Sequence, residues 1–229
     1  MQKTDFFKAT QGKLIVSCQA LSDEPLHSPY IMSRMAYAAK LGGAAGIRAN
    51  SIADICYIRK IVDLPMIGLI KRVHENCDVY ITPTVSEVDE LVSAGVEVIA
   101  MDATDRVRPT GRTIRDDFPE IRKKYPNQLF MADCATFEDA LRAVELGFDC
   151  VGTTLRGYTD ETKEIKIPDF EFIAKLGVEI HIPVIAEGGI WSPEELKKVM
   201  NIPGIHAAVV GSAITRPMEI TKKYVAAIS

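Results

Sequence analysis

The stretch Pro183–Ile190 reads PVIAEGGI, an apolar run that ends in a carboxylate and two glycines. A short, continuous apolar run indicates a strand buried on both faces, as in a parallel sheet. Glu187 then stands at the carboxyl end of this strand, and Gly188 and Gly189 begin the loop that follows. This order predicts that the Glu187 carboxylate lies at the edge of the sheet.

Seven other short apolar runs recur along the chain. They are LIVSCQ (Leu14–Gln19), AAGIR (Ala44–Arg48), PMIGLIK (Pro65–Lys71), VEVIAMD (Val96–Asp102), LFMAD (Leu129–Asp133), DCVGTT (Asp149–Thr154) and AAVVGS (Ala207–Ser212). The segments between the runs carry helix signals, such as the capping box Ser192–Glu195 and a terminal glycine at Gly147. Strands that alternate with helices predict one (β/α)₈ barrel over residues 1–229. The alternative, an open doubly wound sheet, is less favoured because no GxGxxG follows the first run.

Composition and charge limit the class of protein. The chain has 229 residues, 47% hydrophobic and 25% charged, which is typical of a globular enzyme. A net charge of -4 gives no general attraction to nucleic acid or to an anionic membrane. The five cysteines show no CxxC spacing, and no apolar run is long enough to span a bilayer. We therefore expect a cytoplasmic protein with no nucleic-acid or membrane partner.

Polar residues end the predicted strands, at the edge where such barrels place their chemistry. These residues are Gln19, Arg48, Lys71, Asp102, Asp133, Thr153/Thr154, Glu187 and Ser212. Lys71 ends the third strand and Glu187 the seventh, and strands four apart lie across a ring of eight. A base on one wall and an acid on the other suit proton transfer at a carbon held between them. Lysine is a poor base unless burial or nearby cations lower its pKa.

The loops after strands seven and eight predict a phosphate site. Gly188 and Gly189 follow strand seven, and GSAITRP (Gly211–Pro217) follows strand eight. In these barrels the same two loops, with the start of a short extra helix, commonly bind phosphate. Glycine lets backbone N–H groups approach the phosphate oxygens, and Arg216 can add charge-assisted hydrogen bonds.

A metal site is not expected. The four histidines (His27, His74, His181 and His206) do not cluster in the predicted barrel, and no HExxH or paired His/carboxylate spacing occurs.

Over nearly its whole length the chain resembles the N-acetylmannosamine-6-phosphate 2-epimerase family. The matching motifs, in order, are LIVSCQALSDEPLH (Leu14–His27), GGAAGIRAN (Gly42–Asn50), IGLIKR (Ile67–Arg72), YITPT (Tyr80–Thr84), EVIAMDAT (Glu97–Thr104), MADCAT (Met131–Thr136), GFDCVGTTLRGYT (Gly147–Thr159), VIAEGGI (Val184–Ile190) and AVVGSAITRP (Ala208–Pro217). The family usually reads GGAITRP where this chain has Ser212, which keeps the backbone donor and adds a hydroxyl.

The resemblance implies a cofactor-free homodimer of sialic acid and amino-sugar catabolism. Such an enzyme interconverts N-acetyl-D-mannosamine 6-phosphate and N-acetyl-D-glucosamine 6-phosphate. The resemblance makes Lys71 the catalytic base, with Glu187 assisting. Gln19, Arg48, Asp133 and Thr154 would line the sugar site. Gly188, Gly189, Gly211, Ser212 and Arg216 would hold the phosphate.

Two other functions fit the same barrel. A class I aldolase would use Lys71 as a Schiff-base nucleophile. A phospho-sugar sensor would bind the ligand without turnover. Within the epimerase reading, two routes stay open: Lys71 and Glu187 could each serve one face of the sugar carbon, or Lys71 alone could serve both.

Overall fold

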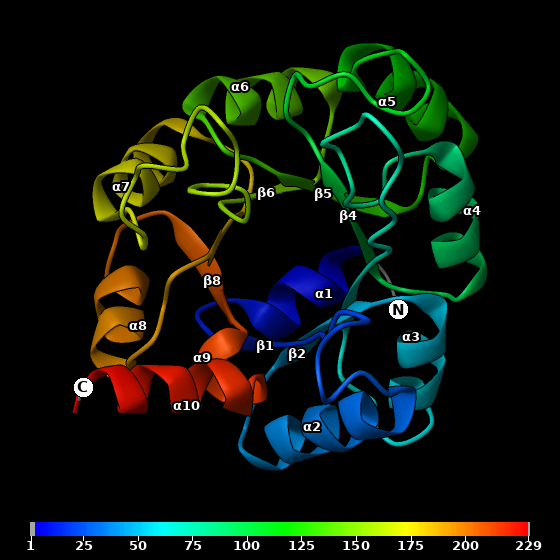
Figure 1. The fold of residues 1–229 in the computed structure, drawn as a ribbon. Helices are drawn as coiled ribbons and strands as arrows, with labels where there is room; N and C mark the ends of the chain where they lie inside the picture. The colour runs from blue at the N-terminus through cyan, green and yellow to red at the C-terminus, as the bar shows by residue number, and fades with distance from the viewer. Residues whose placement is uncertain (1–2, 229) are drawn as a thin grey trace.

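The computed structural model describes residues 3–228, which form a ring of strands surrounded by helices (Figure 1). The strands are β1 (Leu14–Cys18), β2 (Gly46–Asn50), β3 (Met66–Leu69), β4 (Val98–Asp102), β5 (Leu129–Asp133), β6 (Cys150–Gly152), β7 (Val184–Glu187) and β8 (Ile205–Val210). The helices are α1 (Lys3–Thr10), α2 (Pro29–Leu41), α3 (Ile52–Arg59), α4 (Val85–Ser93), α5 (Ile114–Lys124), α6 (Phe137–Leu146), α7 (Phe170–Glu179), α8 (Pro193–Met200), α9 (Ser212–Thr215) and α10 (Pro217–Ala226). None of these helices is long and apolar enough to cross a membrane.

The sheet is a closed parallel barrel in which each strand pairs with its neighbours in chain order. β8 returns to β1, with Leu14 opposite Ala208 and Val16 opposite Val210. The predicted (β/α)₈ barrel is therefore confirmed, and the open doubly wound sheet is wrong. Because the strands follow one another around the ring, β3 and β7 lie on opposite walls, as predicted.

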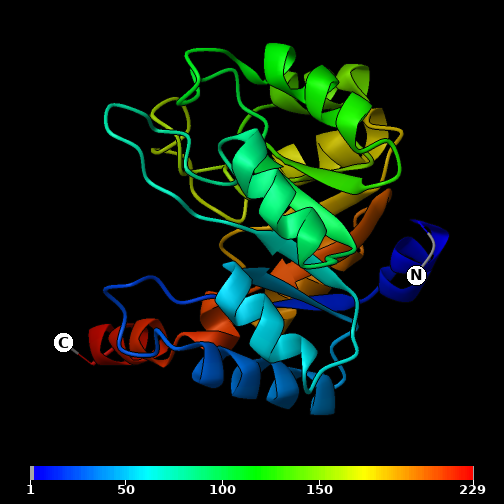
Figure 2. The ribbon, with the colours of Figure 1, turned by 90° about the vertical axis from the view of Figure 1, so that its right-hand side faces the viewer.

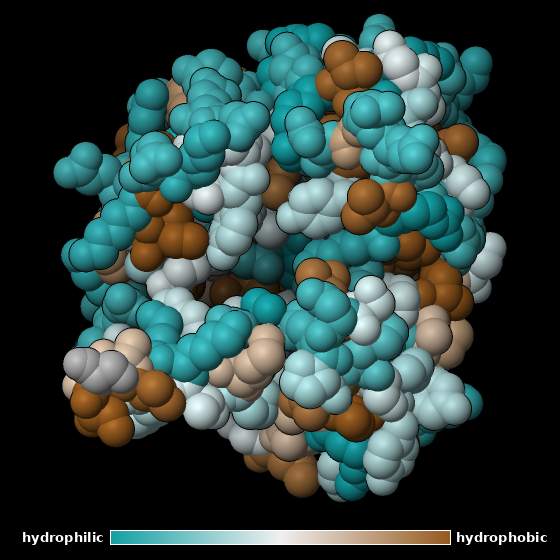
Figure 3. Space-filling model, viewed as in Figure 1, coloured by the Kyte–Doolittle hydropathy of each residue, from teal (hydrophilic) through white to brown (hydrophobic). Residues whose placement is uncertain are grey.

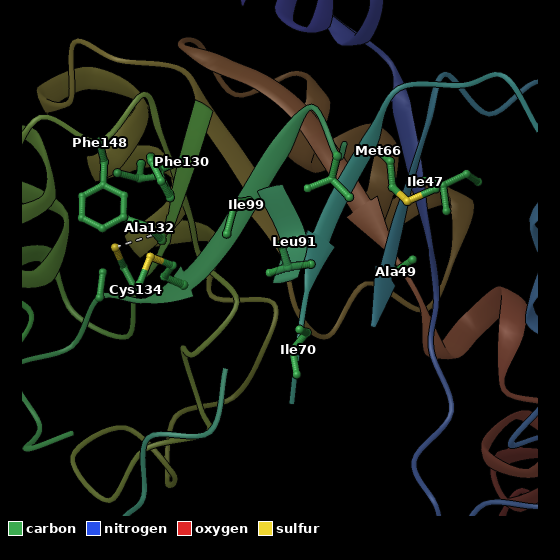
Figure 4. Packing of buried hydrophobic residues seen from close by; sticks show 14 of the residues in the cluster. Ile47, Ala49, Met66, Ile70, Leu91, Ile99, Phe130, Ala132, Cys134 and Phe148 are labelled. Carbon is green, nitrogen blue, oxygen red and sulfur yellow. Dashed lines mark hydrogen bonds between the residues drawn. The ribbon is translucent and has the colours of Figure 1, made fainter. Parts of the chain in front are cut away.

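The core has two layers because alternate strand residues point to opposite faces of the sheet. Apolar side chains such as Ile67, Met131 and Ile185 fill the barrel interior. The other set, including Ile47, Ile99 and Phe130, packs against the helices (Figure 4). α1 crosses the amino end of the barrel, and its buried Phe6 joins the interior cluster. Figure 2 shows α1 at the opposite end from α10 and the long loops.

The interior layers change from apolar to polar towards the carboxyl ends of the strands. Asp133 lies two residues beyond Met131 on β5, and Glu187 lies two residues beyond Ile185 on β7, so each continues an inward-facing row. Gly152 on β6 makes room for this row. A Cβ there would come within 2.2 Å of the Met131 Cε and 3.3 Å of the Asp133 Oδ1.

Local signals set the helix boundaries. Ser192 and Glu195 form the expected reciprocal capping box at the start of α8. Gly147 ends α6 with a φ of 85°, a left-handed conformation that glycine adopts without the strain of a Cβ. The capping box of Thr113 and Asp116 at α5 was not predicted.

Five predicted strand ends are wrong. β2 continues past Arg48 to Asn50, whereas four strands end early: β1 at Cys18 before Gln19, β3 at Leu69 before Lys71, β6 at Gly152 before Thr153/Thr154, and β8 at Val210 before Ser212. Arg48 resembled a strand end because it is charged, but its ion pair with Asp133 allows it to be buried inside the strand. Lys71 lies on a short extension that bridges antiparallel to Ile81.

Candidate active site

A cavity of about 330 Å³ opens at the carboxyl ends of the strands. Figure 3 shows it as a hollow near the centre of this face, with hydrophilic side chains around it. Ten of the eleven residues predicted for the site line it: Gln19, Arg48, Lys71, Thr154, Glu187, Gly188, Gly189, Gly211, Ser212 and Arg216. The eleventh, Asp133, does not line the cavity but is fully buried against Arg48 and Thr154.

An ion pair from β2 and β5 forms the floor of the cavity. The Arg48 guanidinium donates two hydrogen bonds to Asp133, at 3.2 Å and 2.6 Å, and both side chains are almost completely buried. Burial alone would lower the pKa of Arg48, but the charges of Asp133 and Glu187 outweigh it and hold that pKa above its ordinary value. Arg48 therefore places a fixed positive charge at the floor of the cavity.

Glu187 at the end of β7 contacts this pair. One carboxylate oxygen, Oε2, lies 3.2 Å from an Arg48 guanidinium nitrogen and accepts a 3.1 Å hydrogen bond from the Thr154 hydroxyl. Burial raises the pKa of Glu187, and Asp133 adds to the rise, although Arg48 opposes it. A carboxyl group with a raised pKa can hold a proton nearer neutral pH and can therefore act as an acid as well as a base.

Lys71 reaches the same cavity from the β3 side. Burial, followed by the positive charge of Arg48, lowers the pKa of its amine, against the opposing effect of Glu187. A lysine with a lowered pKa is neutral, and so able to accept a proton, over more of the physiological range. Lys71 and Glu187 thus lie on opposite walls of one cavity, and their pKa values are shifted towards each other.

The phosphate end predicted from the sequence lies beside the β7 and β8 loops. Gly188 and Gly189 both have positive φ, at 110° and 71°. A Cβ at Gly189 would also lie 2.5 Å from the carbonyl carbon of Ile167, so this position needs glycine for packing as well as for conformation. Arg216 donates from Nε to Glu24 at 2.9 Å and from NH1 to the Ser212 hydroxyl at 3.3 Å.

Some cavity residues were not predicted. Glu24, Tyr80, Tyr158, Trp191 and Lys223 line the cavity. The Lys223 ammonium lies 4.0 Å from the centre of the Trp191 ring. Glu24 stands in a motif that carries the family resemblance, but Lys223 comes from a C-terminal helix that has no motif.

Other polar strand-end residues have structural partners. The Asp102 carboxylate accepts hydrogen bonds from Thr104 and Arg106 and does not line the cavity. His206, at the start of β8, lies 3.2 Å from the Thr10 hydroxyl at the far end of the barrel. Across the described chain, no group of three or more His, Cys, Asp or Glu side chains is placed to hold a metal ion.

The chain is similar to known proteins over most of its length. The profile of a family described as "Putative N-acetylmannosamine-6-phosphate epimerase" matches residues 32–229. A protein of Clostridioides difficile (strain 630), named "Putative N-acetylmannosamine-6-phosphate 2-epimerase", is 53% identical over 95% of this chain and 96% of its own length. A protein of the same name from Enterobacter sp. (strain 638) is 54% identical over 95% of this chain and 93% of its own length.

A solved structure also matches the whole barrel. It belongs to the N-acetylmannosamine-6-phosphate 2-epimerase from Clostridium perfringens, with a TM-score of 0.91 and 51% identity. The match covers 96% of this chain and 95% of that one. The agreement of sequence and fold over nearly complete lengths leads to one assignment: the chain belongs to the N-acetylmannosamine-6-phosphate epimerase family.

Proposed function

We propose that this protein interconverts N-acetyl-D-mannosamine 6-phosphate and N-acetyl-D-glucosamine 6-phosphate by moving a proton at C2. The observation that carries the proposal is the placement of Lys71 and Glu187 on opposite walls of one cavity. The names of relatives about half identical to this chain supply the substrate class. Sialic acid and amino-sugar catabolism is the setting in which we expect the reaction.

The chemistry needs a proton acceptor and a stabilised anion. The C2 hydrogen of the open-chain sugar is acidic because it lies next to the aldehyde, and its removal gives an enolate. The buried positive charge of Arg48, at the floor of the cavity, favours that anion. Return of a proton to the opposite face of C2 gives the epimer. The C2 hydrogen is the only atom of the sugar that this reaction replaces.

The shifted pKa values suit a reversible reaction. In a two-base epimerase one group must be deprotonated while the other holds a proton, and the roles reverse in the opposite direction. Burial lowers the pKa of Lys71 and raises that of Glu187, so that the pair can hold one shared proton in either arrangement. We therefore propose the two-base route, with Thr154 and Asp133 orienting Glu187.

An NMR assay of the purified protein in D₂O tests the function. N-acetylmannosamine 6-phosphate should convert to its C2 epimer, and the product should carry deuterium at C2. Tight binding without conversion would instead favour a phospho-sugar sensor. A stable lysine adduct after borohydride treatment with substrate would favour a class I aldolase.

We propose that Gly188, Gly189, Gly211, Ser212 and Arg216 bind the phosphate. Substitution of Arg216 by alanine should cost roughly 1.5–3 kcal/mol in kcat/KM, the range for a hydrogen bond to a charged group. The variant also leaves the Glu24 carboxylate without its arginine partner beside the incoming anion. Steady-state kinetics with the phosphorylated and unphosphorylated sugars measure the effect.

The unphosphorylated sugar is the internal control for Arg216, since its rate should fall far less. Arg115→Ala is a matched surface control, because Arg115 is about half exposed and lies outside the cavity. Equal losses on both sugars would place Arg216 in the chemistry of C2 and not at the phosphate.

We expect that the reaction needs no metal ion. The expectation rests on the donor set, because the cavity carboxylates are paired with arginines, Glu187 with Arg48 and Glu24 with Arg216. Treatment with EDTA should leave kcat unchanged in the same NMR assay. Loss of activity that a divalent cation restores would contradict it.

We further propose that the protein acts as one catalytic domain in a cytoplasmic homodimer. Support for a dimer comes from α10, which buries none of its residues and exposes Tyr224 and Val225. Support for the cytoplasm comes from the five cysteines, all of which are free thiols. Light scattering of the purified protein checks the oligomeric state.

A further inference from the structure

The ladder between β2 and β3 breaks just before Lys71. The Ser51 N–H donates to the Leu69 carbonyl at 3.0 Å, and the next rung of a parallel ladder would join the Lys71 N–H to the Ser51 carbonyl. Ser51 instead turns to a φ of 73° and caps α3, and its carbonyl accepts from the Ile55 N–H at 3.1 Å. The turn into the helix therefore takes away the backbone partner of Lys71.

The side chain of Asn50 supplies the missing acceptor. Its Oδ1 accepts the Lys71 N–H at 2.8 Å, and Asn50 is only 8% exposed. On the other edge, the Lys71 segment pairs antiparallel with Ile81, and the Arg72 N–H donates to the Tyr80 carbonyl at 2.9 Å. The main chain at Lys71 is thus held from both sides although it lies beyond the end of β3.

We propose that Asn50 is a positioning residue for Lys71. Its amide oxygen extends the sheet by one rung and fixes the main chain from which the lysine side chain enters the cavity. The lysine side chain is flexible and does not fix its own nitrogen. Holding the main chain limits the region of the cavity that this nitrogen can reach. Asn50 is not among the residues that line the cavity, so it acts through Lys71 and not on the sugar. The proposal rests on the proposed function, in which Lys71 is a base.

Two substitutions of Asn50 separate positioning from a general structural role. Asn50→Ala removes the acceptor, and kcat should fall on the order of 10²-fold because a small displacement of a catalytic group has effects of this size. KM should change by less than about threefold, since the phosphate loops lie on β7 and β8. Asn127→Ala, at an exposed asparagine, is the matched control.

Asn50→Asp keeps an oxygen at the same place and adds a negative charge close to Lys71. This variant should recover most of the kcat that Asn50→Ala loses. Its pH profile should show the pKa of Lys71 shifted upward, because a nearby carboxylate favours the charged ammonium. The readout that separates positioning from a general structural role is the recovery of kcat with KM unchanged, because the added charge would move that pKa in either case.

Several outcomes would overturn the proposal. One is a kcat for folded Asn50→Ala within about threefold of the parent enzyme. If Asn50→Ala does not fold, by circular dichroism, the aspartate variant decides: a kcat that falls on the order of 10²-fold although the acceptor oxygen is kept is evidence against positioning. Failure of the proposed function is recognised separately: the parent enzyme would then give no conversion in the NMR assay, or Lys71→Met would keep the parent kcat, whatever Asn50 does.

Discussion

Lys71→Met should lower kcat for epimerisation by roughly 10²–10⁴-fold, the contribution of a positioned base. Methionine keeps an unbranched side chain of similar reach but cannot accept a proton. The substitution also removes the repulsion between the positive charges of Lys71 and Arg48, so we expect the variant to fold. The NMR assay with N-acetylmannosamine 6-phosphate measures the loss, and incubation in D₂O should give deuterium at C2 of no more than one epimer, the one whose proton faces Glu187.

Lys197→Met is the control, because Lys197 is an exposed lysine on α8 outside the cavity. It should keep the activity of the parent enzyme. The substrate should still bind to Lys71→Met, since the proposed phosphate contacts come from other loops. If Lys71→Met retains a near-normal kcat, the assignment of the base is wrong.

Glu187→Gln should also reduce epimerisation by roughly 10²–10⁴-fold, but it should leave a measurable exchange reaction. The amide has nearly the same shape and can still contact Thr154, yet it cannot deliver or accept the proton on its face of C2. Lys71 can still remove and return the proton on the other face. One epimer should therefore take up deuterium from D₂O without converting to the second.

This exchange pattern separates the two routes. On the two-base route Glu187→Gln gives exchange without conversion. On the single-base route, in which Lys71 serves both faces of a rotated substrate, conversion and exchange should fall together. Glu194→Gln, at an exposed glutamate of α8, should behave as the parent enzyme. An unchanged conversion rate in Glu187→Gln would show that Glu187 takes no part in the proton transfer.

Much of the fold could be predicted because its signals are local. Apolar runs and capping residues each act within a few positions, so PVIAEGGI alone indicates a buried strand that ends at Glu187. The end of β2 could not be predicted in this way. A charge normally ends a buried strand, and the distant carboxylates of Asp133 and Glu187 make the burial of Arg48 favourable.

Part of the candidate site could likewise be predicted from the sequence, and part of it could not. Residues at strand ends follow from the topology, which is why Lys71 and Glu187 could be assigned to opposite walls. The contacts of Glu24 with Arg216 and of Asn50 with Lys71 could not be predicted, because each joins loops whose paths depend on the folded barrel. The turn at Ser51, which has a positive φ without being glycine, also gave no signal in the sequence.

The closure of β8 onto β1 has a consequence for the order of folding. The Thr215 hydroxyl donates to the carbonyl of Ser17 at 2.6 Å, across 198 positions of the chain. Contacts of such long separation carry a large loop entropy and form late, after the local βα units. Arg216 and the second wall of the phosphate end reach their places only with this last step. A nascent or partly refolded chain therefore holds most of its helices and strands before it holds a site that can act on a sugar.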